Sequence, residues 1–261
     1  MPSQDETDII VKGRELYWST WGKMRGENLV TGDISYLKAE NGRGFERIFA
    51  VYIEKNQESR VRQMIALIKA SILPDSMLIT PNTKPENLAE ILSQYGFHID
   101  DSGACMMMYL DDYAETMFDY ADFHITQVME EKQLADWLSI VNEALFGGEL
   151  VTLAQLNDVL HLSNTAFYLG LLNGIPVTTC MTVANGDASV LELVATLDGY
   201  RRRGLASALM NKALTDLRRK GIKTVALNAE PAGISVYKKL GFVEYFKNVV
   251  ASYDRENAVN Q

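Results

Sequence analysis

The chain has 261 residues, of which 47% are hydrophobic and 23% charged, a composition typical of a globular protein with one large or two modest domains. Its net charge of −9 argues against broad nucleic-acid binding and against binding to anionic membranes, because both need an excess of positive charge. The histidines are scattered and Cys105 and Cys180 lie in apolar stretches, so we expect buried free thiols and no metal site.

Neither a signal peptide nor a membrane span is expected. The N-terminus carries Asp5, Glu6 and Asp8, where a signal peptide would need positive charge followed by an apolar run. The most apolar long stretch, 166–183, contains an Asn-Gly pair and a proline, which interrupt it too strongly for a transmembrane helix. We therefore expect a cytoplasmic protein.

The N-terminal half predicts alternating strands and helices. Strands are expected over 47–53, 77–80 and 105–110, and a helix over 85–95, with Pro85 in its first turn. Another helix lies between the first two strands, because apolar residues follow one helical face there: Val61, Met64, Ile65, Ile68 and Ile72.

An acidic stretch, 111–122, follows the third of these strands, and we place a domain boundary within it. The expected domains are residues 1–118 and 119–261. Residues 123–146 should open the second domain with a strand and one or two helices.

The C-terminal half predicts a mixed α/β sheet. Strands are expected over 167–172, 177–183, 189–196 and 224–229, and again from Phe242 onward. Asn173-Gly174 is typical of a hairpin turn, with Ile175-Pro176 lengthening it. The apolar spacing from Ala206 to Leu217 indicates a helix that ends at Gly221, and a short helix spans 234–240. The strand–helix–strand crossover implies a parallel pair in an otherwise antiparallel sheet.

The two halves resemble one another in the order of their elements. The interval from Ile53 to Gly96 is close to that from Thr196 to Gly241, and both intervals end in a helix followed by Gly-Phe. Residue identities hardly match, so the repeat rests on order and spacing.

One loop is suited to binding an anion. After the strand ending at Thr196, the run Arg201-Arg202-Arg203-Gly204-Leu205-Ala206 opens a helix, whose N-terminus presents free backbone N–H groups and the positive end of its dipole. The small Gly204 and Ala206 allow a phosphate to approach the backbone. Taken alone, the arginines are equally consistent with a solvated surface run.

This loop resembles the coenzyme A pyrophosphate motif of the GNAT superfamily of N-acetyltransferases, written Arg/Gln-x-x-Gly-x-Gly/Ala. Downstream, Tyr237-Lys238-Lys239-Leu240-Gly241-Phe242 is similar to a second family block, Tyr-x-x-Leu-Gly-Phe. The resemblance covers residues 123–253 and implies two GNAT-like domains in tandem. The N-terminal copy has Glu54-Lys55-Asn56-Gln57-Glu58-Ser59 in place of the arginine loop, and these acids would repel a pyrophosphate, so we expect a degenerate first copy and one coenzyme site.

The resemblance also implies roles for particular residues. The backbone of Val194, Ala195 and Thr196 would pair with the pantetheine arm of acetyl-CoA. Tyr237 matches a tyrosine that serves as general acid on the departing thiolate, although it could equally be an aromatic anchor for its helix. Glu192 could be the general base or could hold an ion pair. The pyrophosphate would meet the backbone of the loop: Arg201, Arg202, Arg203, Gly204, Leu205, Ala206 and Ser207.

The implied function is direct transfer of an acetyl group from acetyl-CoA to a primary amine, with no metal. A thioester on Cys180 is a disfavoured route, because family members transfer directly. The alternative is a catalytically inactive acetyl-CoA-binding regulatory or scaffolding protein, which the degenerate first domain motivates. The sequence leaves open the acceptor, a small molecule or a peptide, and also a homodimer formed through the first domain.

Overall fold

The structure is a computed structural model that describes residues 3–40, 42, 44–116, 118, 120 and 122–255. The chain forms two compact units. Unit 1 comprises Met1–Cys105 and Tyr245–Gln261, and unit 2 comprises Met106–Glu244. In the described part of the chain, no helix is long and apolar enough to cross a membrane.

Unit 1 is a sheet with three helices. Its strands follow the order β1-β2-β3-β4-β11, in which only β3 and β4 pair in parallel. The elements are α1 (Gln4–Trp21), β1 (Glu27–Val30), β2 (Ile34–Ala39), β3 (Arg47–Val51), α2 (Gln57–Lys69), β4 (Ser76–Ile79), α3 (Leu88–Gln94), the first part of β5 (His98–Tyr109) and most of β11 (Val243–Ser252).

The last strand of the chain completes unit 1. Strand β11 pairs antiparallel with β4, where Val249 lies opposite Ile79, and Ala251 is fully buried in the same core cluster as α2 and α3. Unit 1 is therefore discontinuous in sequence, whereas the expected domains were continuous. The assignment of one acetyltransferase-like copy to residues 1–118 and the other to 119–261 stays a prediction.

The predicted helix after β3 is confirmed, with one correction. Val61, Met64, Ile65 and Ile68 are buried on one face of α2. Ile72 does not belong to that face, because α2 ends at Lys69 and the chain turns through a left-handed Ser71. The side chain of Ile72 is 56% exposed.

Other boundaries in unit 1 also differ from the prediction. Helix α3 begins at Leu88, and Pro85 lies in the turn before it, where its carbonyl accepts the Leu88 N–H at 3.0 Å. Helix α1 and strands β1 and β2 were not predicted from the sequence pattern. A signal for α1 was present, since Ser3 and Glu6 form a reciprocal capping box at its start.

Unit 2 is a mixed sheet in the order β10-β9-β8-β7-β6. Strands β6 to β9 pair antiparallel with one another in this order, and β9 and β10 form the predicted parallel pair. Its elements are β6 (Phe123–Gln127), α4 (Glu131–Val141), a π-helical turn η1 (Asn142–Phe146), α5 (Leu153–Leu160), β7 (Thr165–Leu172), β8 (Ile175–Asn185), β9 (Ala188–Thr196), the 3-10 turn η2 (Asp198–Tyr200), α6 (Leu205–Arg219), β10 (Thr224–Ala229) and α7 (Ile234–Lys239).

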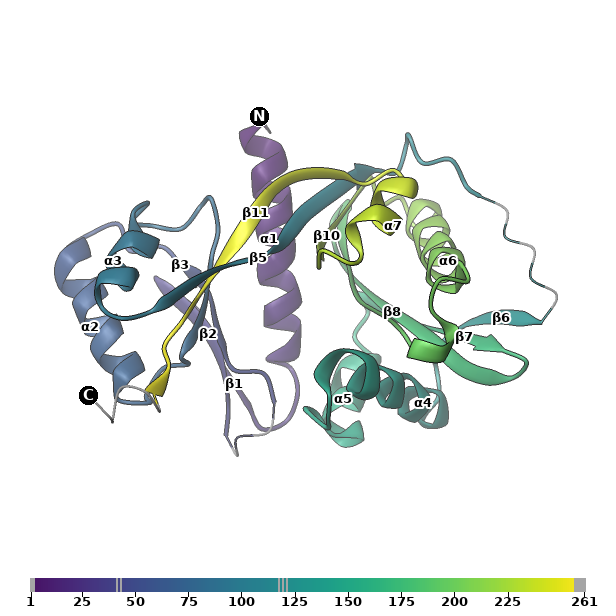
Figure 1. Ribbon diagram of the computed structural model, residues 1–261, viewed down its shortest axis with the longest axis horizontal. Coiled ribbons are helices and arrows are strands. Elements are labelled where there is room, and N and C mark those ends of the chain that lie inside the picture. The colour runs from purple at the N-terminus through teal and green to yellow at the C-terminus, as the bar shows by residue number, and fades with distance from the viewer. Residues whose placement is uncertain are drawn as a thin grey trace. The chain divides into compact units, whose positions relative to one another are not determined.

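Helices cover both faces of the unit 2 sheet, with α4 and α5 on one side and α6 on the other (Figure 1). Phe167 of β7 packs edge-on against Trp137 of α4, with ring centroids 4.9 Å apart. The next residue, Tyr168, points to the opposite face, since side chains alternate along a strand. There its hydroxyl bonds Asp216 of α6 at 3.3 Å.

The hairpin between β7 and β8 is tighter than predicted. Leu172 pairs directly with Ile175, so the turn contains only Asn173 and Gly174, both with positive φ. Two left-handed residues are what a two-residue turn of the primed type requires. Ile175-Pro176 therefore begins β8 and does not lengthen the turn.

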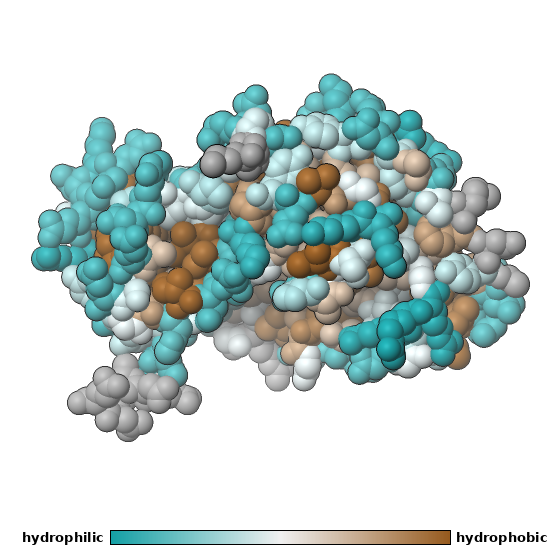
Figure 2. Space-filling view, turned by 45° about the horizontal axis from the view of Figure 1, so that its top comes forward, coloured by the Kyte–Doolittle hydropathy of each residue, from teal (hydrophilic) through white to brown (hydrophobic). Residues whose placement is uncertain are grey.

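Hydrophobic side chains reach the surface as scattered residues. Figure 2 shows a face that is largely hydrophilic with smaller hydrophobic areas between the polar side chains. Among the described residues, the large apolar side chains that are more than half exposed are Ile72, Met129, Ile175 and Val243. Isolated exposed apolar residues are normal in soluble chains and carry no function by themselves.

Candidate active site

The loop between β9 and α6 has the backbone geometry of an anion cradle. Arg202 has φ 62° and Gly204 has φ 77°, so two left-handed residues stand in the turn that starts the helix. Such turns aim successive N–H groups into one concavity. Ala208 makes the first helical bond, to Gly204 O at 3.0 Å, so the N–H groups of Leu205, Ala206 and Ser207 are the donors that a helix leaves open at its start.

Two of the three arginines brace this loop. Arg201 donates from Nε to Thr196 O at 2.9 Å and forms an ion pair with Asp198 at 2.8 Å. Arg203 donates to Gly199 O at 3.0 Å, and its guanidinium lies 5.4 Å from the centre of the Tyr200 ring. Their first effect is therefore on loop shape, and the carboxylate of Asp198 offsets part of the positive charge.

Strand β9 leaves its parallel neighbour before it reaches the loop. The paired register joins Ala188–Val190 to Thr224–Ala226 and ends there, although both strands continue. Beyond that point β9 keeps its partner on the other side, with Ala195 opposite Thr179 and Thr196 opposite Thr178. The backbone edge of residues 194–196 that faces away from β8 has therefore parted from its neighbouring strand.

A β-bulge changes the expected orientation of Glu192. Leu193 has φ 52°, and the register shifts so that Glu192 lies opposite Met181 while Ala195 lies opposite Thr179. Directly paired residues share a face, so Glu192 shares a face with Ala195. Strict period-two alternation along the strand would have placed Glu192 on the same face as Val194 and Thr196, and the bulge overturns this because it adds a residue between Glu192 and Thr196.

Tyr237 lies on α7 in a close-fitting position. Its ring meets Phe242 edge-on, with centroids 6.0 Å apart, and a Cβ added to Gly233 would lie 2.8 Å from the ring. Burial raises the pKa of the Tyr237 hydroxyl, and the negative charges of Glu192 and Glu230 raise it further. The phenol is therefore held in its protonated, donating form, and it shares one electrostatic neighbourhood with these two carboxylates.

Cys180 is a structural residue. Its side chain is fully buried, and burial raises the pKa of the thiol, so the thiolate needed for nucleophilic attack is disfavoured. The carbonyl of Cys180 accepts the indole N–H of Trp137 at 3.2 Å. Cys105 is also buried, which confirms the expectation of free buried thiols.

An open hollow beside η1 was not anticipated. Its volume is about 580 Å³, and η1 packs against β9, the strand that carries Glu192. Glu143 and Glu149 give the hollow two exposed carboxylates. The glycine pair between them was the only sequence signal of an irregular turn here. The lining residues are Ala135, Leu138, Ser139, Asn142, Glu143, Gly147, Gly148, Glu149 and Leu153.

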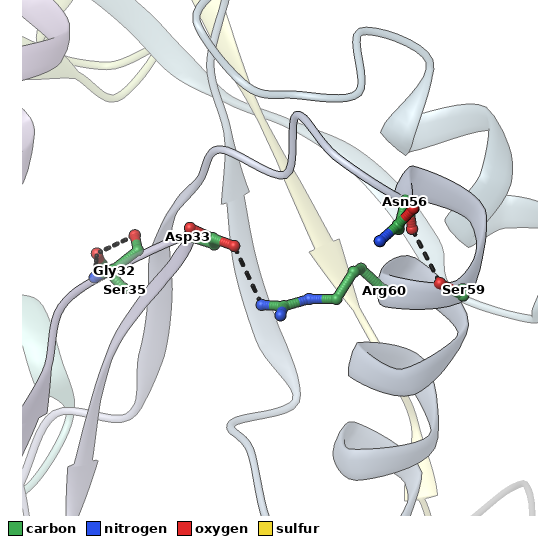
Figure 3. A network of polar contacts seen from close by, with 6 residues as sticks. All are labelled: Gly32, Asp33, Ser35, Asn56, Ser59 and Arg60. Atoms are coloured by element: carbon green, nitrogen blue, oxygen red, sulfur yellow. Dashed lines mark hydrogen bonds and ion pairs between the residues drawn. The ribbon is translucent and has the colours of Figure 1, made fainter.

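Helix α2 of unit 1 begins much as α6 does, with a left-handed N-cap residue, but different side chains surround its start. Its N-cap residue, Asn56, is left-handed like Gly204, with φ 50°. In Figure 3, Ser59 donates to Asn56 O at 3.1 Å, and Arg60 reaches from the first turn to Asp33 at 3.2 Å. The two helix starts therefore share a left-handed N-cap residue, while the arginine near the start of α2 is paired with a carboxylate.

The fold and the second block of the sequence define the class of the protein, an acyltransferase. The sequence model of the Acetyltransferase (GNAT) family matches residues 109–242, more than half of the chain, and the protein belongs to that family. Comparison with curated protein sequences finds no match.

Solved structures resemble the chain over nearly its whole length. A GCN5-related N-acetyltransferase from Kribbella flavida is 17% identical with a TM-score of 0.65, covering 92% of this chain and 94% of its own. One from Sphaerobacter thermophilus is 13% identical with a TM-score of 0.64, covering 97% and 93%. A tandem GNAT protein from the clavulanic acid biosynthesis pathway is 12% identical with a TM-score of 0.63, covering 97% and 96%. At these identities the likeness shows the fold alone.

Proposed function

We propose that unit 2 transfers an acetyl group directly from acetyl-CoA to a primary amine. The observation that carries this proposal is the left-handed turn at Arg202 and Gly204, which opens α6 where β9 has parted from β10. An anion cradle beside a free strand edge suits a cofactor that joins a pyrophosphate to an amide-bearing arm. The backbone of 194–196 binds the arm, and that of 201–207 binds the pyrophosphate.

The transfer needs three proton movements. The free amine attacks the thioester carbonyl carbon, a C–N bond forms, and the C–S bond then breaks to release the thiolate. The new amide nitrogen loses its second proton, which returns the tyrosinate formed at Tyr237 to its phenol form. Tyr237 donates its phenolic proton to the sulfur, a role supported by burial and by the negative charges that keep the phenol protonated. Glu192, which lies in the same electrostatic neighbourhood, takes the proton from the incoming ammonium.

The acceptor in this proposal is a cationic amine. The hollow beside η1 carries Glu143 and Glu149, whose charges attract an ammonium group on its approach. The net charge of −9 acts in the same direction. This attraction acts between exposed charges, so added salt should weaken the binding of the amine.

The test is release of free CoA from acetyl-CoA in the presence of a broad panel of amines, including polyamines, amino acids, aminoglycosides and peptides. The proposal predicts release that depends on the acceptor, together with an acetylated product of matching mass. Tight binding of acetyl-CoA without turnover on any amine would contradict it and would favour a coenzyme-binding regulatory protein.

A further inference from the structure

The segment that joins β5 to β6 is tied along the whole length of α6. Its described residues are 110–116, 118, 120 and 122. Arg218, in the last turn of α6, donates to Tyr113 O at 3.3 Å. Midway along, Asn211 accepts hydrogen bonds from the Tyr113 hydroxyl and from the Thr116 N–H, the latter at 3.0 Å. These contacts explain a buried asparagine in the middle of an amphipathic helix.

The segment ends against the anion cradle. The hydroxyl of Tyr120 donates to Arg203 O at 2.9 Å. The ring of Tyr120 is held between two others, stacked on Phe118 at 6.3 Å and edge-on to Phe123 at 6.0 Å. Two aromatic contacts and one hydrogen bond to the backbone therefore fix the position of the Tyr120 hydroxyl beside the loop.

This bond determines the direction of a donor in the cradle. The peptide group between Arg203 and Gly204 is planar, and in a trans peptide the C=O and the N–H point to opposite sides. Holding the Arg203 carbonyl on the Tyr120 side therefore turns the Gly204 N–H to the other side. A Cβ at Gly204 would collide with the Tyr120 hydroxyl, so the contact exists only because residue 204 has no side chain.

We propose that Tyr120 is a positioning residue for coenzyme binding, which orients the Gly204 N–H toward the pyrophosphate through the Arg203 carbonyl. Tyr120 touches no reacting atom, so its effect falls on coenzyme affinity and leaves the chemical step unchanged. This inference rests on the proposed function of unit 2, and it assigns a role to a residue outside both sequence motifs.

The experiment compares Tyr120→Phe with the wild-type chain, because the substitution removes the hydroxyl and keeps the ring stack. We expect the Kd for CoA by calorimetry and the KM for acetyl-CoA to rise about 3- to 10-fold, the scale of one net hydrogen bond. The kcat of Tyr120→Phe should stay within about twofold of the wild-type value, because the lost hydrogen bond does not involve the reacting atoms. With S-acetylpantetheine, which lacks the pyrophosphate, kcat/KM should be unchanged.

Tyr113→Phe is the matched control, since it removes a hydroxyl from the same segment but leaves the Thr116 bond to Asn211 in place. Coenzyme affinity should be unchanged in this variant. The proposal would be overturned if Tyr120→Phe bound CoA as tightly as the wild type. It would also be overturned if kcat/KM fell equally with acetyl-CoA and with S-acetylpantetheine. Calorimetry needs no turnover, so a wild-type chain that binds CoA without transferring acetyl refutes only the proposed function. A chain that does not bind CoA at all refutes both.

Discussion

Replacing Tyr237 by phenylalanine isolates the proton donor from the packing of α7. The ring contacts to Phe242 and Gly233 involve carbon atoms only, and phenylalanine keeps them. Only the phenolic oxygen is lost, so the free energy of unfolding should change by no more than about 1 kcal/mol, the scale of one net hydrogen bond. Because the fold is nearly unchanged, a large fall in kcat can be assigned to the lost phenolic proton.

The expected magnitude follows from the leaving group. A positioned acid contributes roughly 10²- to 10⁴-fold, or about 2.7–5.5 kcal/mol. A thiol has a pKa of about 8.5, so its thiolate is already a moderate leaving group near neutral pH and needs less help than an alkoxide would. We therefore expect kcat to fall by roughly 10²-fold, the low end of that range, with little change in the KM for acetyl-CoA.

The assay is acceptor-dependent release of the CoA thiol, measured from pH 6 to 10 for the wild type and for Tyr237→Phe. Burial and neighbouring carboxylates raise the pKa of Tyr237, so the donating form persists above the ordinary tyrosine value of about 10. The wild-type rate should show no alkaline fall from this group within the range. Tyr95→Phe, at an exposed tyrosine of unit 1, is the control. A kcat of Tyr237→Phe within about threefold of the wild type would refute the acid role, since even the weakest expected contribution is larger.

Three further perturbations test the loop, the hollow and unit 1. Gly204→Ala places a side chain at φ 77°, which costs about 1–2 kcal/mol, so coenzyme Kd should rise about 5- to 30-fold by calorimetry. The added loss should be smaller in a Tyr120→Phe background, where the colliding hydroxyl is gone. Glu143→Gln with Glu149→Gln should raise the KM for a cationic amine roughly 2- to 10-fold at low salt and leave that for acetyl-CoA unchanged in steady-state kinetics. Burial raises the pKa of Glu27 to about 7, so folding is favoured while this carboxyl is protonated, and that contribution to stability is lost as the pH rises from about 4.5 to about 7. Glu27→Gln should therefore raise Tm by roughly 2–4 °C at pH 8 and leave it unchanged at pH 4.

Local patterns predicted most of unit 2. The apolar spacing of α6, the Asn-Gly turn and the glycine after the helix are all short-range signals, and the structure has α6 at Leu205–Arg219 with a left-handed Gly221 just beyond it. Strand β10 has the bounds that were predicted, Thr224–Ala229. These elements follow from period and turn chemistry because each one is decided by residues close together in the chain.

Contacts between distant residues escaped the same reasoning. The bulge at Leu193 reverses the face of Glu192, yet a leucine carries no sequence signal for a left-handed conformation. The pairing of β11 with β4 joins residues more than 160 positions apart, and period-two alternation says nothing about partners. Tyr120 was hidden for a related reason, since its partner is a backbone carbonyl 83 residues away.

The starts of α2 and α6 share one backbone feature but differ in their side chains. Both helices follow a left-handed residue, Asn56 in one and Gly204 in the other, so a shared turn geometry survives where residue identities do not. Asparagine tolerates that conformation but brings a side chain into the turn, whereas glycine leaves space for the Tyr120 hydroxyl to approach the backbone. In unit 1 the neighbouring Arg60 is paired with Asp33, and Glu58 in the first turn of the helix places a carboxylate there, paired with Arg62. Backbone geometry is therefore necessary for a pyrophosphate cradle but insufficient, and the prediction of a single coenzyme site per chain rests on side-chain charge and space.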